Sequence, residues 1–241
     1  MRQEWDVFVN YIVNKGGYHI ILNGLLATLV IAVFGLIFGF LIGSIIAVIK
    51  VTPPYKRAVR IPQKICDIYV LIFRGTPMVV QLLIIHFVLF PLMGVSFSNL
   101  VFTKHFFLQG QVFEAIIVFS LNSGAYISEI MRGGINSVNK GQLEAGRALG
   151  LSYPITMIKV VIPQAFRNVL PTLGNEFITL IKETSVVYFI AIIDLTRSFQ
   201  NITSSELIVT VPYLMLGLTY LALVGLISLF VKRLEKKQKK A

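Results

Sequence analysis

The sequence predicts an all-α membrane protein with about five transmembrane helices, and its composition and charge-free runs carry that prediction. The chain has 241 residues, of which 56% are hydrophobic and only 14% are charged, against roughly 25% charged residues in soluble domains. Three runs lack any charged residue: Ile20–Ile49 with 30 residues, Gly75–Thr103 with 29 and Leu207–Val231 with 25. A membrane-spanning helix needs about 20 apolar residues, so each run is long enough to cross. A chain this short cannot form a soluble core large enough to bury them.

Basic residues predict the orientation of these helices, because positive charge stays on the cytoplasmic side. Three segments, 50–64, 132–167 and 232–240, hold 16 of the 22 lysines and arginines, whereas the opposite-side segments hold four. We therefore expect an external N-terminus, a cytoplasmic C-terminus and an odd number of crossings. A single transmembrane domain, 1–241, is expected, with a basic cytoplasmic tail at 232–241. The expected spans are 20–49, 65–91, 112–135, 168–192 and 208–231.

The first expected span carries Gly35, Gly39 and Gly43 at a spacing of four residues. This spacing places a groove on one face of the helix, where another helix backbone can approach closely. The second expected span is broken at residues 74–77, which read Arg-Gly-Thr-Pro. We expect Thr76 to cap a new helix there, with Pro77 at its first position.

The third and fourth expected spans carry charged residues inside them. Intramembrane charges are costly and usually face a cavity or a partner. On each span the polar residues recur at helical spacing and share one face. These residues are Asn122, Tyr126 and Glu129 on the third span, and Thr172, Glu176, Thr179 and Glu183 on the fourth. Two such stripes facing each other would form a wet path through the bundle.

The loop between these two spans, at about 136–167, predicts a docking knob. Residues 141–149 should form a short helix that Gly150 ends, and Ser152 should cap a second helix that starts near Pro154. Two short helices joined by a glycine hinge make a rigid projection on the cytoplasmic face. The first helix has a small apolar face, suited to a groove in a partner, formed by Ala145, Ala148 and Leu149.

The same loop resembles the signature of the permease subunits of ABC importers. That signature reads Glu-Ala-Ala, three residues, Gly, about nine residues, Ile, any residue, Leu-Pro. Here Glu144-Ala145-Gly146 is followed by Gly150 and by residues 160–163, Val-Val-Ile-Pro. Gly146 replaces the second alanine at a cost of about 1 kcal/mol in helix propensity, and Ile162 replaces the leucine. The resemblance implies that this helix docks into an ATPase subunit, through Glu144, Ala145, Gly146, Ala148, Leu149 and Gly150.

Further stretches are similar to the polar amino acid importers of this family, of the histidine, glutamine and arginine type. They are residues 73–77, 126–135, 174–178, 182–185 and 194–197, and the resemblance covers about 20–231. It implies the type I importer permease fold in a bacterial inner membrane that the chain crosses several times. It also implies three partners: two ATPase copies, a second permease copy or paralogue, and an extracytoplasmic amino-acid-binding protein.

No phosphate-binding loop of the form Gly-x-x-x-x-Gly-Lys-Ser/Thr occurs in the sequence. We therefore expect ATP and magnesium to bind the partner ATPase, and no cofactor or metal to bind this chain. The sequence also lacks a paired-carboxylate, Ser-His or zinc constellation, which argues against an enzyme.

A zwitterionic amino acid needs an anion for its ammonium group and donors for its carboxylate. Glu176 is the leading candidate for the anion, from its place on the polar stripe and from the family resemblance. The other candidate contacts are Glu129, Asn122, Tyr126, Thr179, Glu183, Arg74 and Thr76. The alternative for two of the acids is a structural ion pair, Glu129 with Arg132 and Glu183 with Lys182. The excess of acids in these two spans hints at a cationic amino acid.

Two other functions fit part of the sequence. A self-sufficient secondary transporter or channel explains the hydrophobicity and the polar stripes, but not the loop from Glu144 to Pro163, and the inverted repeat that such transporters often carry is not detectable. The net charge of +11 would suit nucleic acid, but the basic residues lie beside the hydrophobic runs, as topology signals do.

Overall fold

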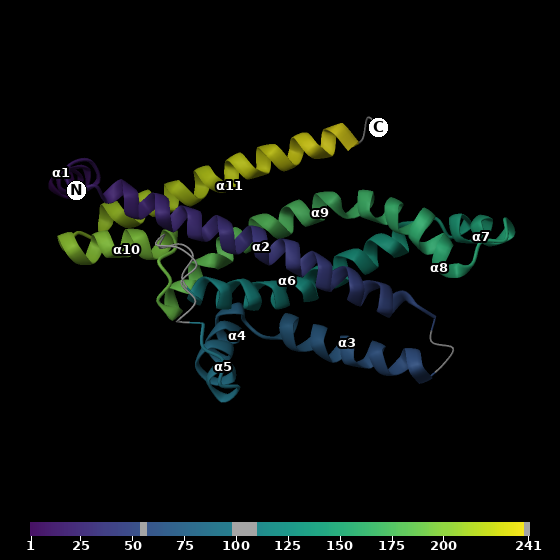
Figure 1. The fold of residues 1–241 in the computed structure, drawn as a ribbon. Helices are drawn as coiled ribbons and strands as arrows, with labels where there is room; N and C mark the ends of the chain where they lie inside the picture. The colour runs from purple at the N-terminus through teal and green to yellow at the C-terminus, as the bar shows by residue number, and fades with distance from the viewer. Residues whose placement is uncertain (54–56, 98–109, 239–241) are drawn as a thin grey trace.

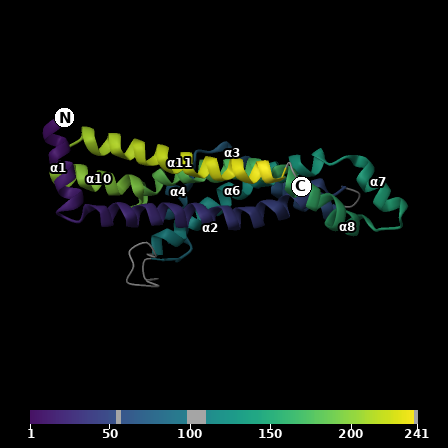
Figure 2. The same ribbon diagram turned by 90° about the horizontal axis from the view of Figure 1, so that it is seen from above.

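The structure is a computed structural model that describes residues 1–53, 57–97 and 110–238. Within these ranges all regular secondary structure is helical, which confirms the all-α prediction. The long helices α2, α6, α9 and α11 run side by side, and α1 lies at one end of this bundle (Figures 1 and 2). Helices α7 and α8 project from the opposite end (Figure 1).

The closest helix pair is α2 (Gly17–Val51) with α6 (Gly110–Ser137). A Cβ atom added to Gly39 would lie 2.8 Å from Cβ of Ser123, and one added to Gly43 would lie 2.8 Å from the carbonyl oxygen of Gly124. Real Cβ atoms do not approach other atoms so closely, so this contact requires glycine. The predicted glycine groove is therefore confirmed, and α6 is the helix that fills it.

The predicted break in the second span is also confirmed. Helix α3 (Arg57–Gly75) and the segment Met78–Leu92 are bent by 109° relative to each other. This segment comprises α4 (Met78–Ile84), a π-helical turn (Ile85–Leu89) and α5 (Phe90–Leu92). In Figure 1 it leaves the bundle at the end of α3.

The predicted cap at this break is wrong. The N-cap position of α4 belongs to Pro77, and no side chain caps the helix. The hydroxyl of Thr76 instead donates to the carbonyl oxygen of Ile72 at 2.7 Å, which closes the end of α3. The side-chain amide of Gln81 donates to the carbonyl oxygens of Phe73 (2.8 Å) and Thr76 (2.9 Å). Gln81 thus satisfies the backbone groups that the break exposes, as buried polar groups require.

The loop after α6 contains α7 (Lys140–Ala148) and α8 (Tyr153–Thr156). Helix α8 continues through a π-helical turn (Met157–Val161) into α9 (Ile162–Glu183). The second short helix of the predicted knob is therefore the beginning of the fourth long helix, which starts well before residue 168. Pro163 was expected in the loop at about 136–167, but it lies in the first turn of α9. Proline is tolerated in the first turn of a helix, and a π-helical turn accommodates the local irregularity.

The rest of the chain forms the end of the bundle that carries α1 (Arg2–Val13). A 3₁₀ helix (Thr184–Ile190) follows α9. Neither α1 nor the next helix, α10 (Leu195–Glu206), was expected from the sequence. The Asp194 carboxylate caps α10 by accepting from the backbone N–H groups of Thr196 at 3.1 Å and Arg197 at 2.9 Å. The last helix is α11 (Thr210–Gln238).

Among the described residues, α2 and α11 are each long and apolar enough to cross a membrane. The bent pair of α3 with Met78–Leu92 makes a third candidate if it forms one broken span. Helices α6 and α9 carry the polar stripes. The crossing number of five and the orientation stay predictions.

Candidate functional site

The polar face of the bundle is formed by α6 and by the residues of α3 and α9 that contact it. Arg74 lies in the last turn of α3 and is exposed, and its guanidinium carbon lies 5.3 Å from the ring centre of Tyr126 on α6. Glu176 on α9 is half-buried and accepts a hydrogen bond from the hydroxyl of Ser123 at 3.4 Å. Tyr126 and Ser123 lie three residues apart on α6, which places them one helical turn from each other. Arg74 at the helix break and Glu176 on α9 therefore contact the same turn of α6 from two different elements.

The expectation that the α6 stripe faces the α9 stripe is wrong for Asn122. Its side chain is 3% exposed and points at the helix break. The Asn122 amide donates to the side-chain carbonyl of Gln81 at 2.9 Å and to the backbone carbonyl of Phe73 at 3.3 Å. The bent segment that begins at Met78 covers this side of α6, so Asn122 holds the break in place.

Glu129 also faces away from α9, and the structural alternative is confirmed for it. Its carboxylate contacts the ammonium of Lys50 at 2.7 Å and the guanidinium of Arg132 at 2.6 Å. Lys50 in turn contacts Asp67 on α3 at 2.9 Å. Both oxygens of Glu129 are engaged, and the four charges join α2, α3 and α6.

The remaining α9 candidates extend the stripe of Glu176 along the helix. Thr179 is half-buried, and its hydroxyl donates to the carbonyl oxygen of Asn175 at 3.1 Å. Glu183 is half-buried as well, and its sequence neighbour Lys182 is exposed. Ser123 is the contact that sequence reasoning missed. Because Ser123 directly follows Asn122, its side chain lies about 100° further around α6, on the side that α9 covers.

The projecting knob confirms several predictions. Helix α7 ends where expected, with Gly150 in the left-handed conformation at φ +80°. Its outer residues Glu144, Ala145 and Ala148 are exposed, and Leu149 is 82% exposed although it is apolar. An exposed leucine beside two alanines is a surface that a partner groove can cover.

Other details of the knob differ from the predictions. Ser152 occupies the N-cap position of α8 without a capping side-chain bond. Asn139, which was not singled out, caps α7 by accepting from the backbone N–H of Gly141 at 2.8 Å. Gly146 is buried against Thr156 of α8 instead of contributing to the exposed face.

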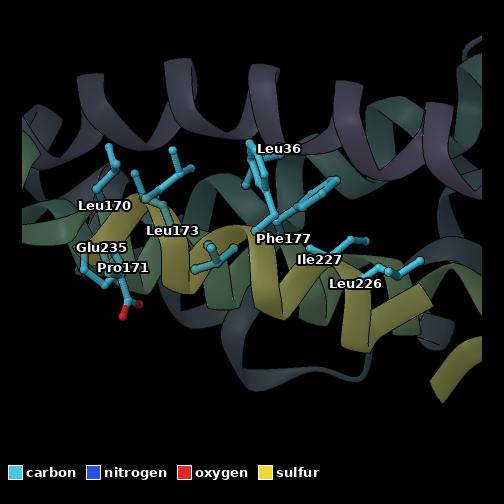
Figure 3. A pocket seen from close by; sticks show the side chains of 12 residues that line it. Leu36, Leu170, Pro171, Leu173, Phe177, Leu226, Ile227 and Glu235 are labelled. Atoms are coloured by element: carbon cyan, nitrogen blue, oxygen red, sulfur yellow. The ribbon is translucent and has the colours of Figure 1, made fainter. Parts of the chain in front are cut away.

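A hollow of about 480 Å³ lies elsewhere, between α2, α9 and α11. Figure 3 shows Leu36, Leu173, Phe177 and Ile227 projecting around it. Its lining is apolar except for Glu235 at one end, so it lacks the paired donors and acceptors that a zwitterion needs. The polar face of α3, α6 and α9 is the better candidate site.

Comparison with known proteins adds independent information. The chain matches the family described as binding-protein-dependent transport system inner membrane components over residues 39–240. It is 39% identical over 218 residues to a protein of Rickettsia conorii named as a glutamine transport system permease, GlnP, covering 90% of this chain and 92% of that protein. It is 37% identical over 219 residues to the arginine transport system permease protein ArtQ of Bacillus subtilis, covering 91% of this chain and 92% of ArtQ.

Solved structures with the same fold agree. A crystal structure of an amino acid ABC transporter with histidines matches with a TM-score of 0.78 and 30% sequence identity, covering 94% of this chain and 98% of that chain. An inward-facing structure of the MetNI methionine ABC transporter matches with a TM-score of 0.73 at 19% identity, covering 91% of this chain and 96% of that chain, which supports the fold alone.

Proposed function

The chain belongs to the family of binding-protein-dependent transport system inner membrane components, and on that premise we propose how it moves its substrate. It is a membrane-embedded permease subunit of an amino acid ABC transporter.

The observation that carries the proposal is that Arg74 on Tyr126 and Glu176 on Ser123 contact the same turn of α6. An amino acid is a zwitterion, and the planar guanidinium of Arg74 can donate two parallel hydrogen bonds to its carboxylate. Glu176 offers an acceptor to its ammonium group or to a basic side chain. The named relatives GlnP and ArtQ concern glutamine and arginine, both of which carry these two charged groups. The substrate class is therefore a polar amino acid, including a basic one.

The polar face needs a cover, because exposed charges in the hydrocarbon region are costly. Arg74 and Lys182 are exposed in this single chain, and Thr172 is exposed on the same stripe. A second copy or a paralogue that packs over this face would enclose the charges between two permeases. The pathway then runs between the two chains, with Glu176 near its middle.

The knob is the part that couples transport to ATP. Leu149 and its neighbours on α7 dock into a groove of a separate ATPase, which binds ATP and magnesium. Two ATPase copies serve two permeases in a bacterial inner membrane. An extracytoplasmic binding protein delivers the amino acid at the end of the bundle that carries α1 and α10. The permease itself performs no chemistry on the substrate.

Reconstitution tests the proposal directly. The chain is placed in proteoliposomes with its ATPase and binding protein, and uptake of labelled glutamine, arginine, histidine and leucine is measured. We expect uptake of the polar amino acids only when ATP and the binding protein are both present. Uptake by the permease alone, driven by an ion gradient, would instead establish a secondary transporter.

A further inference from the structure

Helix α1 is fixed across one end of the bundle instead of running along it. Figure 1 shows α1 nearly end-on, and Figure 2 shows it crossing the ends of α2, α10 and α11. Phe8 is 6% exposed and stacks on Phe199 of α10, with ring centres 6.4 Å apart. The Glu4 carboxylate accepts from the backbone N–H groups of Thr210 at 3.1 Å and Val211 at 3.2 Å, at the start of α11. These contacts fix which side of α1 stays uncovered.

The uncovered side carries an apolar stripe beside a polar one. Trp5, Val9 and Val13 follow each other at four-residue spacing and are 48%, 39% and 66% exposed. At 100° per residue these three side chains span an arc of about 80°. The next stripe around the helix is polar and exposed, and consists of Asp6, Asn10 and Asn14. A helix with this pattern, lying across the end of a membrane bundle, is suited to the boundary between lipid and water.

The apolar stripe continues onto the exposed apolar surface of α11. Trp5 joins Leu214 and Leu218 of α11 around a hollow of about 430 Å³, with Arg2 at its edge. Leu214 and Leu218 are each 57% exposed on a helix that is apolar enough to cross a membrane. The hollow is therefore continuous with the exposed apolar surface of α11, and Arg2 supplies a positive charge beside it.

We propose that α1 is an interfacial anchor, embedded at the headgroup boundary of the bilayer, with phospholipid against Trp5 and the α11 hollow. Amphipathic helices of this kind bury their apolar face about 5–10 Å into that boundary. Tryptophan favours this depth because its ring is apolar and its N–H is polar. The anchor fixes the depth at which this end of the bundle lies in the membrane. The inference is independent of the transported solute and of the coupling knob.

Trp5 is the one tryptophan of the 241-residue chain, so its fluorescence reports on α1 directly. The full chain is reconstituted into phosphatidylcholine vesicles whose acyl chains carry bromine either close to the headgroup or close to the chain ends. The Trp5→Phe variant supplies the background to subtract if partner subunits are present. We expect strong quenching by the shallow bromines, weak quenching by the deep ones and little quenching by aqueous iodide.

Matched variants separate lipid contact from packing within the protein. Val9→Asp places a charge on the apolar stripe and should weaken shallow-bromine quenching and increase iodide quenching. Asn10→Asp places the same charge on the polar stripe and should change neither. Quenching of wild-type Trp5 by iodide alone, or most strongly by the deep bromines, would overturn the anchor. Loss of lipid quenching only when the binding protein is added would show that α1 is a protein docking surface instead.

Discussion

A Cβ atom added to Gly146 would overlap Cγ2 of Thr156 and lie 3.0 Å from its Oγ1. Gly146 is on α7 and Thr156 on α8, so this contact sets how closely the exposed helix of the knob packs against the start of α9. Thr156 is fully buried, and its hydroxyl donates to the carbonyl oxygen of Ser152 at 3.1 Å. A β-branched side chain held in this way cannot turn aside easily. The glycine is therefore required by packing, although it weakens the helix.

The first prediction follows from this contact. Gly146→Ala should push α7 away from α8 at a cost of about 1–3 kcal/mol, typical of overpacking. Substrate-stimulated ATP hydrolysis and uptake should fall while insertion into the membrane is retained. Thr156→Ser removes the obstructing methyl group and keeps the hydroxyl, so the double variant should recover both activities. A double variant as impaired as Gly146→Ala would show that the pair does not set the position of the knob.

The second prediction concerns the end of α7. Gly150 has φ +80°, and an added Cβ would meet nothing within 4 Å. Strain and charge are therefore the only penalties at this exposed hinge. Gly150→Asp should reduce ATP-driven uptake and weaken co-purification with the ATPase. Gly150→Asn tolerates the same backbone conformation without the charge and should retain most of the activity. Wild-type uptake by the aspartate variant would remove the case for docking at this hinge.

The third prediction tests the packing of α2 on α6. Gly43→Ala should destabilise the chain by about 1–3 kcal/mol, because the added carbon would lie 2.8 Å from two backbone atoms that cannot move aside. Gly225→Ala on α11 is the matched control, since an added Cβ there meets nothing within 4 Å. That control should be neutral or slightly stabilising, as helix propensity favours alanine. Thermal unfolding in detergent, followed by loss of monodisperse protein, measures both.

How far the sequence predicts this fold depends on whether a feature is local. The groove at Gly39, the break before Pro77 and the end of α7 at Gly150 follow from spacing or from backbone preference, and all three were predictable. The partners of Asn122 and Glu129 were not. Helical spacing shows that two residues share a face, but not which neighbouring helix covers that face. Here the cover comes from α2, α3 and the bent segment, which lie far away in the sequence.

The same distinction applies to Thr76 and Ser123. A threonine before a proline satisfies the local rule for a helix cap, yet Gln81, five residues later, hydrogen-bonds the Thr76 hydroxyl at 2.9 Å. Ser123 on α6 contacts Glu176 on α9, and its position after Asn122 places it on another side of α6 without showing which helix lies there. Tertiary contacts therefore decided both cases.

The fourth prediction concerns orientation. Lys140 on α7 and Ser204 on α10 are exposed at opposite ends of the bundle (Figure 1). The basic residues predict that Lys140 and Lys236 are cytoplasmic and that α10, with Asn201 and Ser204, is external. In a Cys66→Ser background, a membrane-impermeant maleimide added to intact cells should label Ser204→Cys and spare Lys140→Cys. Permeabilised cells should label both. The reverse pattern in intact cells would overturn the orientation.

The last prediction concerns Glu176. Glu176→Gln keeps the shape of the side chain and removes its charge, while an acceptor for the Ser123 hydroxyl remains. If the carboxylate binds the ammonium or guanidinium group of a substrate, its loss should cost about 1.5–3 kcal/mol, or roughly a 10- to 150-fold loss of affinity. The loss should be greatest for arginine, lysine and histidine. Concentration-dependent uptake by the reconstituted complex measures the apparent affinity for each amino acid.

A purely structural role for Glu176 makes a different prediction, since the carboxylate would then serve only to hold α9 against α6. In that case the same variant should lower expression and thermal stability and leave the apparent affinity unchanged. Glu235→Gln is the matched control, because it removes a carboxylate on α11 that borders the apolar hollow and not the polar face. It should change uptake for no substrate. An affinity for arginine in Glu176→Gln equal to that of the control, at equal protein yield, would contradict substrate binding by Glu176 and leave Arg74 and Tyr126 as the groups to test next.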